Sequence, residues 1–324
     1  MGSLAGPSIR PLPQGVYVPT LTFFKENEEL DLPTLKSHVV RLARAGVSGI
    51  TTQGSNGEAV HLSHSERKLA TSAVREALDS NNFKNMPIIV GCAAQSTQET
   101  IELCKDAASC GGDYALILPP SYYKGFYTRA SLLGFFTDVA TASPIPLLIY
   151  NYPGAASGTD LTSDDIIELA KHPKIVGCKL TCGNTGKLAR IAAATASPKP
   201  SNTETTPPPF LVLGGSADFT LQTLVAGGHG VLAGLGNVAP KALIKLFHSY
   251  QSADRHEAQA LQGLVARGDW AAIRGNVVGT KAGLRAWFNY GGYGRRPFPR
   301  PTAEEDEIWK EGFGEIVALE NSLA

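Results

Sequence analysis

Short runs of apolar and β-branched residues recur along the chain, and stretches with apolar positions at helical spacing separate them. Each run is apolar through most of its length, as expected for strands that are covered on both faces of a parallel sheet. Strands that alternate with helices in this way predict repeated βα units. The predicted strands cover residues 15–22, 46–53, 87–92, 113–118, 146–151, 175–181, 210–214 and 230–235.

Polar capping residues mark the starts of several helices between these strands. Asp31 precedes a leucine and a proline and leads into apolar residues at helical spacing. Residues 63–66 and 96–99 each have a serine followed three positions later by a glutamate, the spacing of a capping box, and 162–165 opens a further helix. Eight strands alternating with helices favour a closed (β/α)8 TIM barrel over an open doubly wound sheet, because closure removes both sheet edges.

The pattern divides the chain into three parts. The predicted parts are an N-terminal extension over 1–14, the barrel over 15–240 and a C-terminal helical region over 241–324. Within the last part, apolar spacing predicts helical runs over 258–265, 270–288 and 302–319. Residues 197–209 are rich in proline, serine and threonine, so we expect an exposed, mobile loop without a role in the site.

Charge and apolar content narrow the class of partner. The formal net charge is +0 and charged residues make up 18% of the chain, so no basic surplus attracts nucleic acid or an anionic membrane. No apolar run approaches the roughly 20 residues that cross a bilayer. The first 15 residues lack the features of a secretory signal. We therefore expect a small-molecule partner and a cytoplasmic location, with a short mitochondrial presequence as the open alternative.

The cysteines indicate neither disulfides nor a metal site. Cys92, Cys104, Cys110, Cys178 and Cys182 are an odd number in a large chain, which is typical of a reducing compartment. Cys178 and Cys182 are four residues apart, but no second Cys or His pair follows at zinc-ligand spacing. The sequence predicts no metal.

Lys179 is the first candidate for chemistry. Strand alternation over 175–181 sends residues 177, 179 and 181 to one face and Cys178 and Leu180 to the other, and one of these faces is the barrel interior. Desolvation there penalises the charged ammonium and favours a neutral amine that can attack a carbonyl. The alternative is a strand-end lysine whose ammonium reaches solvent.

Tyr150 and residues 54–58 support the catalytic interpretation. Tyr150 ends the preceding strand at a depth comparable to that of Lys179, where a phenol can transfer protons during imine chemistry. The turn Gly54-Ser55-Asn56-Gly57-Glu58 can converge backbone N–H groups, a hydroxyl and an amide on a carboxylate. Taken singly, a packing tyrosine and an ordinary βα turn are the alternatives. No dinucleotide-binding or Walker A pattern occurs.

The order and spacing of five short segments resemble the dihydrodipicolinate synthase and N-acetylneuraminate lyase family. They are GSNGE after the second strand, PPSYY after the fourth, YNYP at the fifth, GCK at the sixth and GGHGV leading into the eighth. The resemblance covers about residues 15–240, and the helical tail is also similar.

The resemblance implies roles for particular residues. Lys179 would form the Schiff base, Tyr150 would shuttle protons, and Ser55 with Asn56 would bind the carboxylate of the pyruvyl group. Tyr123 matches a tyrosine that in the family reaches across a dimer interface into the neighbouring active site.

Two further positions, Gly214 and Leu232, fall where family members line the pocket. The resemblance also implies a homotetramer built as a dimer of dimers and no cofactor other than the covalent lysine imine.

Departures from the family pattern bear on the substrate. Dihydrodipicolinate synthases have a threonine pair in place of Ser55-Asn56 and an arginine shortly after the YN-x-P motif, whereas 153–158 contain no arginine. Bidentate recognition of a second carboxylate is thereby lost. GSNGE resembles 4-hydroxy-2-oxoglutarate aldolases and eukaryotic 2-keto-3-deoxy sugar-acid aldolases.

We therefore predict a class I aldolase that needs no metal and cleaves a 4-hydroxy-2-oxo acid to pyruvate and an aldehyde. The small residues at 154–157 leave room for a polyhydroxylated or an acidic aldehyde portion, and both substrates stay open. The alternatives are dihydrodipicolinate synthase, N-acetylneuraminate lyase and a non-catalytic binding barrel.

Overall fold

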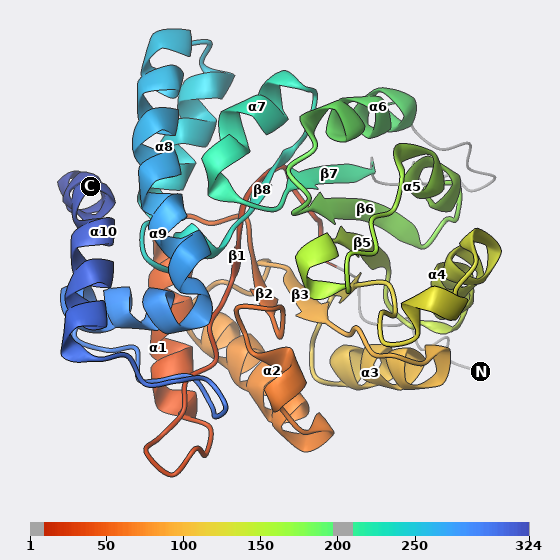
Figure 1. Ribbon diagram of the computed structural model, residues 1–324, viewed down its shortest axis with the longest axis horizontal. Coiled ribbons are helices and arrows are strands. Elements are labelled where there is room, and N and C mark those ends of the chain that lie inside the picture. The colour runs from red at the N-terminus through yellow and green to blue at the C-terminus, as the bar shows by residue number, and fades with distance from the viewer. Residues whose placement is uncertain (1–9, 197–209, 324) are drawn as a thin grey trace.

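The computed structural model, which describes residues 10–196 and 210–323, is a closed barrel of eight parallel strands in chain order (Figure 1). Pairing of β1 with β8 closes the ring, with Val16 opposite Val231. The predicted barrel is therefore confirmed, and the open sheet is excluded. Every predicted strand is present, and each is somewhat shorter than predicted. They are β1 (Gly15–Pro19), β2 (Gly49–Thr52), β3 (Ile88–Gly91), β4 (Tyr114–Ile117), β5 (Leu147–Asn151), β6 (Ile175–Leu180), β7 (Leu211–Gly214) and β8 (Gly230–Leu232).

Four of the helices that surround the barrel begin at the predicted caps, Asp31, Ser63, Ser96 and Thr162. The Asp31 side chain accepts a hydrogen bond from Thr34 N, and residues 63–66 form a complete capping box. Ser96 caps its helix through Glu99 N, but the Glu99 carboxylate lies 3.3 Å from His64 Nε2, so only one half of that predicted box forms. The helices are α1 (Leu32–Arg44), α2 (His64–Ser80), α3 (Thr97–Ser109), α4 (Arg129–Ala142), α5 (Ser163–Leu169), α6 (Thr185–Thr195), α7 (Thr220–Val225) and α8 (Pro240–Gln251).

Two long helices follow the barrel, α9 (Arg255–Phe288) and α10 (Ala303–Ser322). The predicted runs over 258–265 and 270–288 belong to the single helix α9, which Asn276 interrupts with φ 47° and ψ −139°. Helix α9 packs on the short 3₁₀ helices η4 (Ala217–Phe219) and η5 (Gly234–Asn237), which follow β7 and β8. The C-terminal region therefore covers part of the barrel at the carboxyl ends of the strands (Figure 1).

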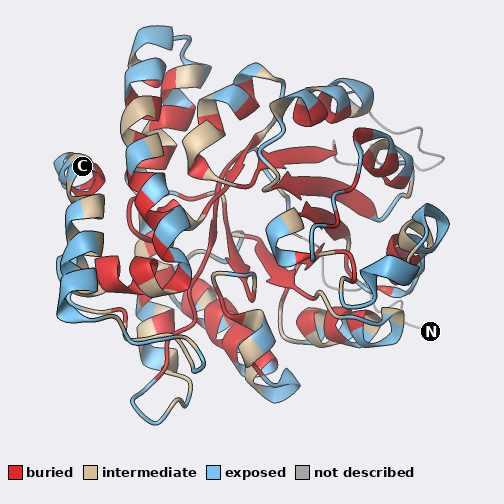
Figure 2. Cartoon of the chain, viewed as in Figure 1, coloured by how far each residue is buried: buried red, intermediate tan, exposed pale blue. Residues whose placement is uncertain are grey.

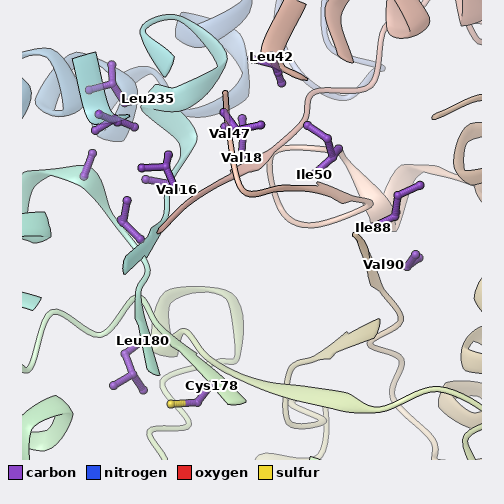
Figure 3. Packing of buried hydrophobic residues seen from close by; sticks show 14 of the residues in the cluster. Val16, Val18, Leu42, Val47, Ile50, Ile88, Val90, Cys178, Leu180 and Leu235 are labelled. Atoms are coloured by element: carbon purple, nitrogen blue, oxygen red, sulfur yellow. The ribbon is translucent and has the colours of Figure 1, made fainter. Parts of the chain in front are cut away.

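Two layers of apolar side chains form the core, and the strands are buried along their length (Figure 2). The layer between strands and helices includes Val16, Ile50 and Cys178 (Figure 3). The barrel interior holds a separate cluster of Tyr17, Ile89, Tyr114, Leu116, Leu148, Tyr150, Val176, Leu211, Leu213 and Leu232. Since the two layers alternate along each strand, the side that faces the interior is fixed by the sequence pattern.

A register shift in β6 adjusts this alternation next to the candidate lysine. Leu147 pairs with Ile175 but Leu148 pairs with Gly177, so Val176 is an extra residue and joins the interior cluster. A bulge of this kind re-aims the residues that follow it. Beyond the bulge, Tyr150 pairs directly with Lys179.

The sequence predicted no disulfide, no metal site and no membrane-spanning segment, and the described residues can be compared with these three expectations. All five cysteines are free thiols, and Cys92, Cys104 and Cys178 are buried. Within 10–196 and 210–323 there is no group of three or more His, Cys, Asp or Glu side chains placed to hold a metal ion. Over the same ranges, no helix has the length and apolar character needed to cross a membrane. The loop predicted over 197–209 lies outside the described residues.

Candidate active site

Lys179 and Tyr150 lie side by side on neighbouring strands at the end of the barrel where the active sites of such folds occur. The Lys179 Nζ atom is 4.0 Å from the centroid of the Tyr150 ring. Each residue is only 4% exposed. In the part of the chain that the structure describes, no carboxylate pairs with this amine. Lys179 therefore points into the interior with an aromatic ring, and not an anion, as its close neighbour.

A cavity of about 420 Å³ brings this pair together with the predicted carboxylate nest. Ser55 and Asn56 reach it from the turn after β2, across the barrel from Lys179. The Asn56 amide also approaches Gly234, where a Cβ would lie 3.0 Å from Nδ2, so η5 leaves room for this side chain. The described residues that line this cavity are Ser55, Asn56, Tyr150, Tyr152, Lys179, Thr181, Gly183, Gly215, Ser216, Asp218, Phe219, Gly234, Asp269, Ala272, Ile273 and Asn276.

A second cavity of about 330 Å³ adjoins the first and shares Ser55, Tyr150, Tyr152 and Asn276 with it. It extends over β3 to β5, and most of the other side chains that line it are small or apolar. They are Gln53, Gly54, Glu58, Ala59, Val60, His61, Gly91, Ala93, Leu116, Leu118, Gly154, Ala155 and Phe298. Gly54, predicted to bind substrate, therefore lines this second cavity.

Three predicted residues line neither of these two cavities. Gly214 faces away from the Lys179 cavity, since a Cβ there would lie 2.5 Å from Thr223 Oγ1; the next residue, Gly215, lines the cavity. The strand alternates its faces, so the neighbouring position is the one that lines the cavity in this structure. Leu232 packs in the barrel interior opposite Tyr17. Tyr123 is 59% exposed on the loop after β4, where its ring packs edge-on against Tyr122.

The turn that carries Ser55 and Asn56 is held in place by a buried ion pair. Glu58 has a left-handed backbone (φ 54°), and its N–H donates to Ser55 O at 3.2 Å. Its carboxylate accepts from the Lys281 ammonium of α9 at 2.7 Å and from Arg295 N at 2.9 Å. The side chains of Glu58 and Lys281 are both 0% exposed. Burial lowers the pKa of Lys281, and the neighbouring Glu58 charge opposes that shift.

Helix α9 also supplies residues that the sequence interpretation missed. Asn276, at the interruption of the helix, lines both cavities, and Asp269 lines the Lys179 cavity. The Asp269 carboxylate accepts from Ser216 Oγ at 2.6 Å, Ala217 N at 2.7 Å and Asp218 N at 3.0 Å. Burial raises the pKa of Asp269 to about 6 in spite of these donors.

Tyr152 is a missed residue for which the sequence did carry a signal. It stands two positions after Tyr150, so strand alternation places both on one side. The two rings stack with centroids 5.8 Å apart and an interplanar angle of 25°. No comparable pattern marks Asn276 or Asp269, because they reach the site only through the packing of α9.

A closed (β/α)8 barrel with a polar cavity at the carboxyl ends of its strands has the architecture of barrel enzymes. The chain belongs to the dihydrodipicolinate synthetase family, whose model matches residues 12–311. This assignment confirms the family resemblance, and it makes the protein a lyase-type enzyme of that family.

Relatives of known name agree with this assignment. The chain is 54% identical to a probable 4-hydroxy-2-oxoglutarate aldolase, mitochondrial, of Emericella nidulans, over 97% of this chain and 98% of the relative. It is 48% identical to an L-threo-3-deoxy-hexylosonate aldolase of Hypocrea jecorina, over 96% and 98% of the two chains.

Solved structures share the fold. A dihydrodipicolinate synthase family protein from Coccidioides immitis superposes with a TM-score of 0.84 at 30% identity, covering 97% of this chain and 99% of the other. YagE, an Escherichia coli prophage protein of the dihydrodipicolinic acid synthase family solved in complex with pyruvate, gives 0.85 at 25% identity, covering 94% and 99%.

Proposed function

We propose that the protein is a Schiff-base aldolase that cleaves a 4-hydroxy-2-oxo acid to pyruvate and an aldehyde. The observation that carries this proposal is the placement of Lys179 beside Tyr150 and across one cavity from Ser55 and Asn56. The names of the Emericella and Hypocrea relatives, both aldolases, support the reaction class.

Binding and imine formation come first. Ser55 and Asn56 hold the substrate carboxylate, which places the adjacent C2 carbonyl at Lys179 and reduces the entropic cost of attack. The amine adds to C2, and loss of one water from the carbinolamine leaves a protonated imine. Tyr150 donates and accepts the protons of this exchange.

Carbon–carbon cleavage follows from the positive charge on the imine. As Tyr150 removes the proton of the C4 hydroxyl, the C3–C4 bond breaks and its electron pair moves to the imine, leaving an enamine and a free aldehyde. Protonation of the enamine at C3 and hydrolysis by one water release pyruvate and restore the amine. The cycle consumes no oxidant or reductant, and we propose that it needs no metal.

The alternatives differ in the second substrate or in the absence of chemistry. Gly154 and Ala155 line the second cavity, and residues 153–158 lack the arginine that dihydrodipicolinate synthases have after the YN-x-P motif. Without that guanidinium, the carboxylate of aspartate semialdehyde has no bidentate partner, which disfavours this second substrate. Sialic acid cleavage and a binding role without turnover are tested by measuring pyruvate release from N-acetylneuraminate and from 4-hydroxy-2-oxo acids.

Borohydride trapping tests the imine directly. Incubation with pyruvate and borohydride in the presence of EDTA should add one reduced pyruvyl group to Lys179 and inactivate the enzyme, because reduction makes the imine permanent. Peptide mass mapping locates the adduct. Lys187, which is equally buried but ion-paired with Asp160, is an internal control that should stay unmodified.

Two outcomes would overturn parts of this scheme. Full turnover and an unmodified Lys179 after trapping would exclude the imine. Loss of turnover in EDTA that returns on addition of a divalent cation would instead indicate a metal-dependent aldolase. The Lys179→Met variant, which keeps the apolar stem and lacks the amine, should show neither the adduct nor turnover.

We further propose a homotetramer in which Tyr123 completes the active site of a neighbouring subunit. Tyr122, Tyr123 and Phe126 are exposed together on the loop after β4, an apolar surface suited to a subunit contact. Sedimentation analysis should give four times the chain mass, and Tyr123→Phe should lower turnover without dissociating the assembly. A fully active monomer would contradict both expectations.

The cellular location remains the predicted cytoplasm, with mitochondria as the alternative. The Emericella relative is named as a mitochondrial protein, which supports the alternative. Fractionation of cells that express the full chain distinguishes the two compartments.

A further inference from the structure

Two carboxylates lie at one side of the Lys179 cavity. Asp218, in η4 after β7, and Asp269, on α9, both line it. The two carboxylates are near enough to interact electrostatically. Burial is the main cause that raises the pKa of Asp269, and the Asp218 charge raises it further. This side of the cavity therefore has an acidic character that the imine chemistry at Lys179 does not use.

Asp218 has an oxygen without a partner. Its Oδ1 atom is buried and accepts no hydrogen bond from the described residues, whereas the Asp269 Oδ2 atom accepts from Ser216 and two backbone N–H groups. A buried carboxylate oxygen without a donor has lost its hydration without compensation. The hydroxyls of Thr181 and Ser216 and the amide of Asn276 line the same cavity, so its polar groups are suited to hydroxylated carbon atoms.

Cationic groups are scarce around the same space. Among the described residues that line the two cavities, Lys179 is the single lysine or arginine, and the imine occupies its amine. Arg295 is absent from the lining of the second cavity, and its guanidinium donates to His61 O and pairs with Glu66. A second carboxylate on the substrate would therefore meet Asp218 and Asp269 without a counter-charge.

We infer that the part of the substrate beyond C4 is a neutral, polyhydroxylated chain whose hydroxyls donate to Asp218, and that a substrate ending in a second carboxylate is disfavoured. This inference rests on the proposed aldolase function and assigns its substrate class: a six-carbon 3-deoxy-2-oxo sugar acid in preference to 4-hydroxy-2-oxoglutarate. Asp218 is the specificity-determining residue, and Asp269 fixes its position by accepting from its backbone N–H.

The test compares kcat/KM for the two substrates, each supplied as both C4 epimers and followed by pyruvate release. The wild-type protein should prefer the 3-deoxy-hexulosonate. Asp218→Asn removes the charge and keeps the shape, and it should lower kcat/KM for the sugar acid by roughly 10- to 100-fold, the range for a hydrogen bond to a charged group. For 4-hydroxy-2-oxoglutarate, the same variant should show a higher kcat/KM, because a repulsive charge is gone.

A matched variant and a trapping assay make the outcomes distinct. Asp138→Asn removes an exposed carboxylate on the outer helix α4 and should change neither value. If borohydride traps pyruvate on Lys179 but 4-hydroxy-2-oxoglutarate is the better substrate in the wild type, the inference fails and the aldolase function stands. Equal losses for both substrates in a folded Asp218→Asn protein would also overturn the inference. Failure of trapping itself would instead count against the proposed function.

Discussion

Substitution of Tyr150 by phenylalanine is expected to lower kcat by about 10²- to 10⁴-fold, the range typical of a positioned acid–base group. The hydroxyl is the only group removed, and the ring that packs against Lys179 and stacks on Tyr152 is retained. The loss should therefore appear in turnover and not in the fold. Steady-state pyruvate release measures kcat, and thermal unfolding measures stability.

A second tyrosine in the barrel interior provides the control for this substitution. Tyr114 belongs to the same interior cluster, but its hydroxyl donates to Arg10 O at 2.6 Å and does not line either cavity. Tyr114→Phe should cost stability, on the order of 1 kcal/mol for one hydrogen bond, and leave kcat nearly unchanged. If Tyr150→Phe turns over at a near-normal rate, Tyr150 has no part in proton transfer.

Trapping separates binding from proton transfer in the Tyr150→Phe protein. Ser55, Asn56 and Lys179 are untouched, so pyruvate should still form a reducible adduct, although more slowly. If the variant traps pyruvate slowly and also cleaves substrate poorly, Tyr150 takes part in the proton transfers of both imine formation and carbon–carbon cleavage. A variant that neither binds nor folds would assign it to packing.

The barrel could be predicted from the sequence because its information is local. Each strand is a short apolar run, and caps such as Asp31 and Ser63 mark where helices begin. Eight such alternating units favour closure, and the pairing of β1 with β8 that completes the ring is the long-range contact that the structure adds. Strand ends were less accurate, since the apolar pattern continues into the loops after pairing has stopped.

The site was predictable where its residues stand on strands. Lys179 and Tyr150 lie in consecutive strands at matching depth, so their pairing followed from alternation and from the order of the strands. Asp269 and Asn276 were not predictable, because α9 is long, and which of its turns meets η4 depends on tertiary packing. The backbone interruption at Asn276 likewise leaves no mark in the apolar spacing.

Helix α9 is joined to the turn that carries Ser55 and Asn56 through a buried ion pair, so its packing bears on the site as well as on the cover of the barrel. Lys281 of α9 bonds Glu58 at 2.7 Å and the carbonyl of Tyr293 at 2.8 Å. Glu58 in turn bonds the carbonyl of Ser55 through its N–H. A change at Lys281 should therefore reach the turn with Ser55 and Asn56, the proposed carboxylate site, although Lys281 itself does not line either cavity.

Lys281→Met should lower the free energy of unfolding by about 3–5 kcal/mol, because it leaves the fully buried Glu58 carboxylate without its counter-charge. The KM for substrate should rise in the fraction that stays folded, since the turn carrying Ser55 and Asn56 loses its anchor. Denaturant unfolding gives the stability, and pyruvate release at varied substrate concentration gives the KM.

A double variant and an exposed lysine test whether the buried charge is the cause. Adding Glu58→Gln to Lys281→Met removes the uncompensated charge but keeps an acceptor for Arg295 N, so most of the lost stability should return. Lys310→Met breaks an exposed pair with Glu307 and should cost less than about 1 kcal/mol. If Lys281→Met is as mild as Lys310→Met, or if the double variant is no more stable than the single one, the ion pair does not hold the turn.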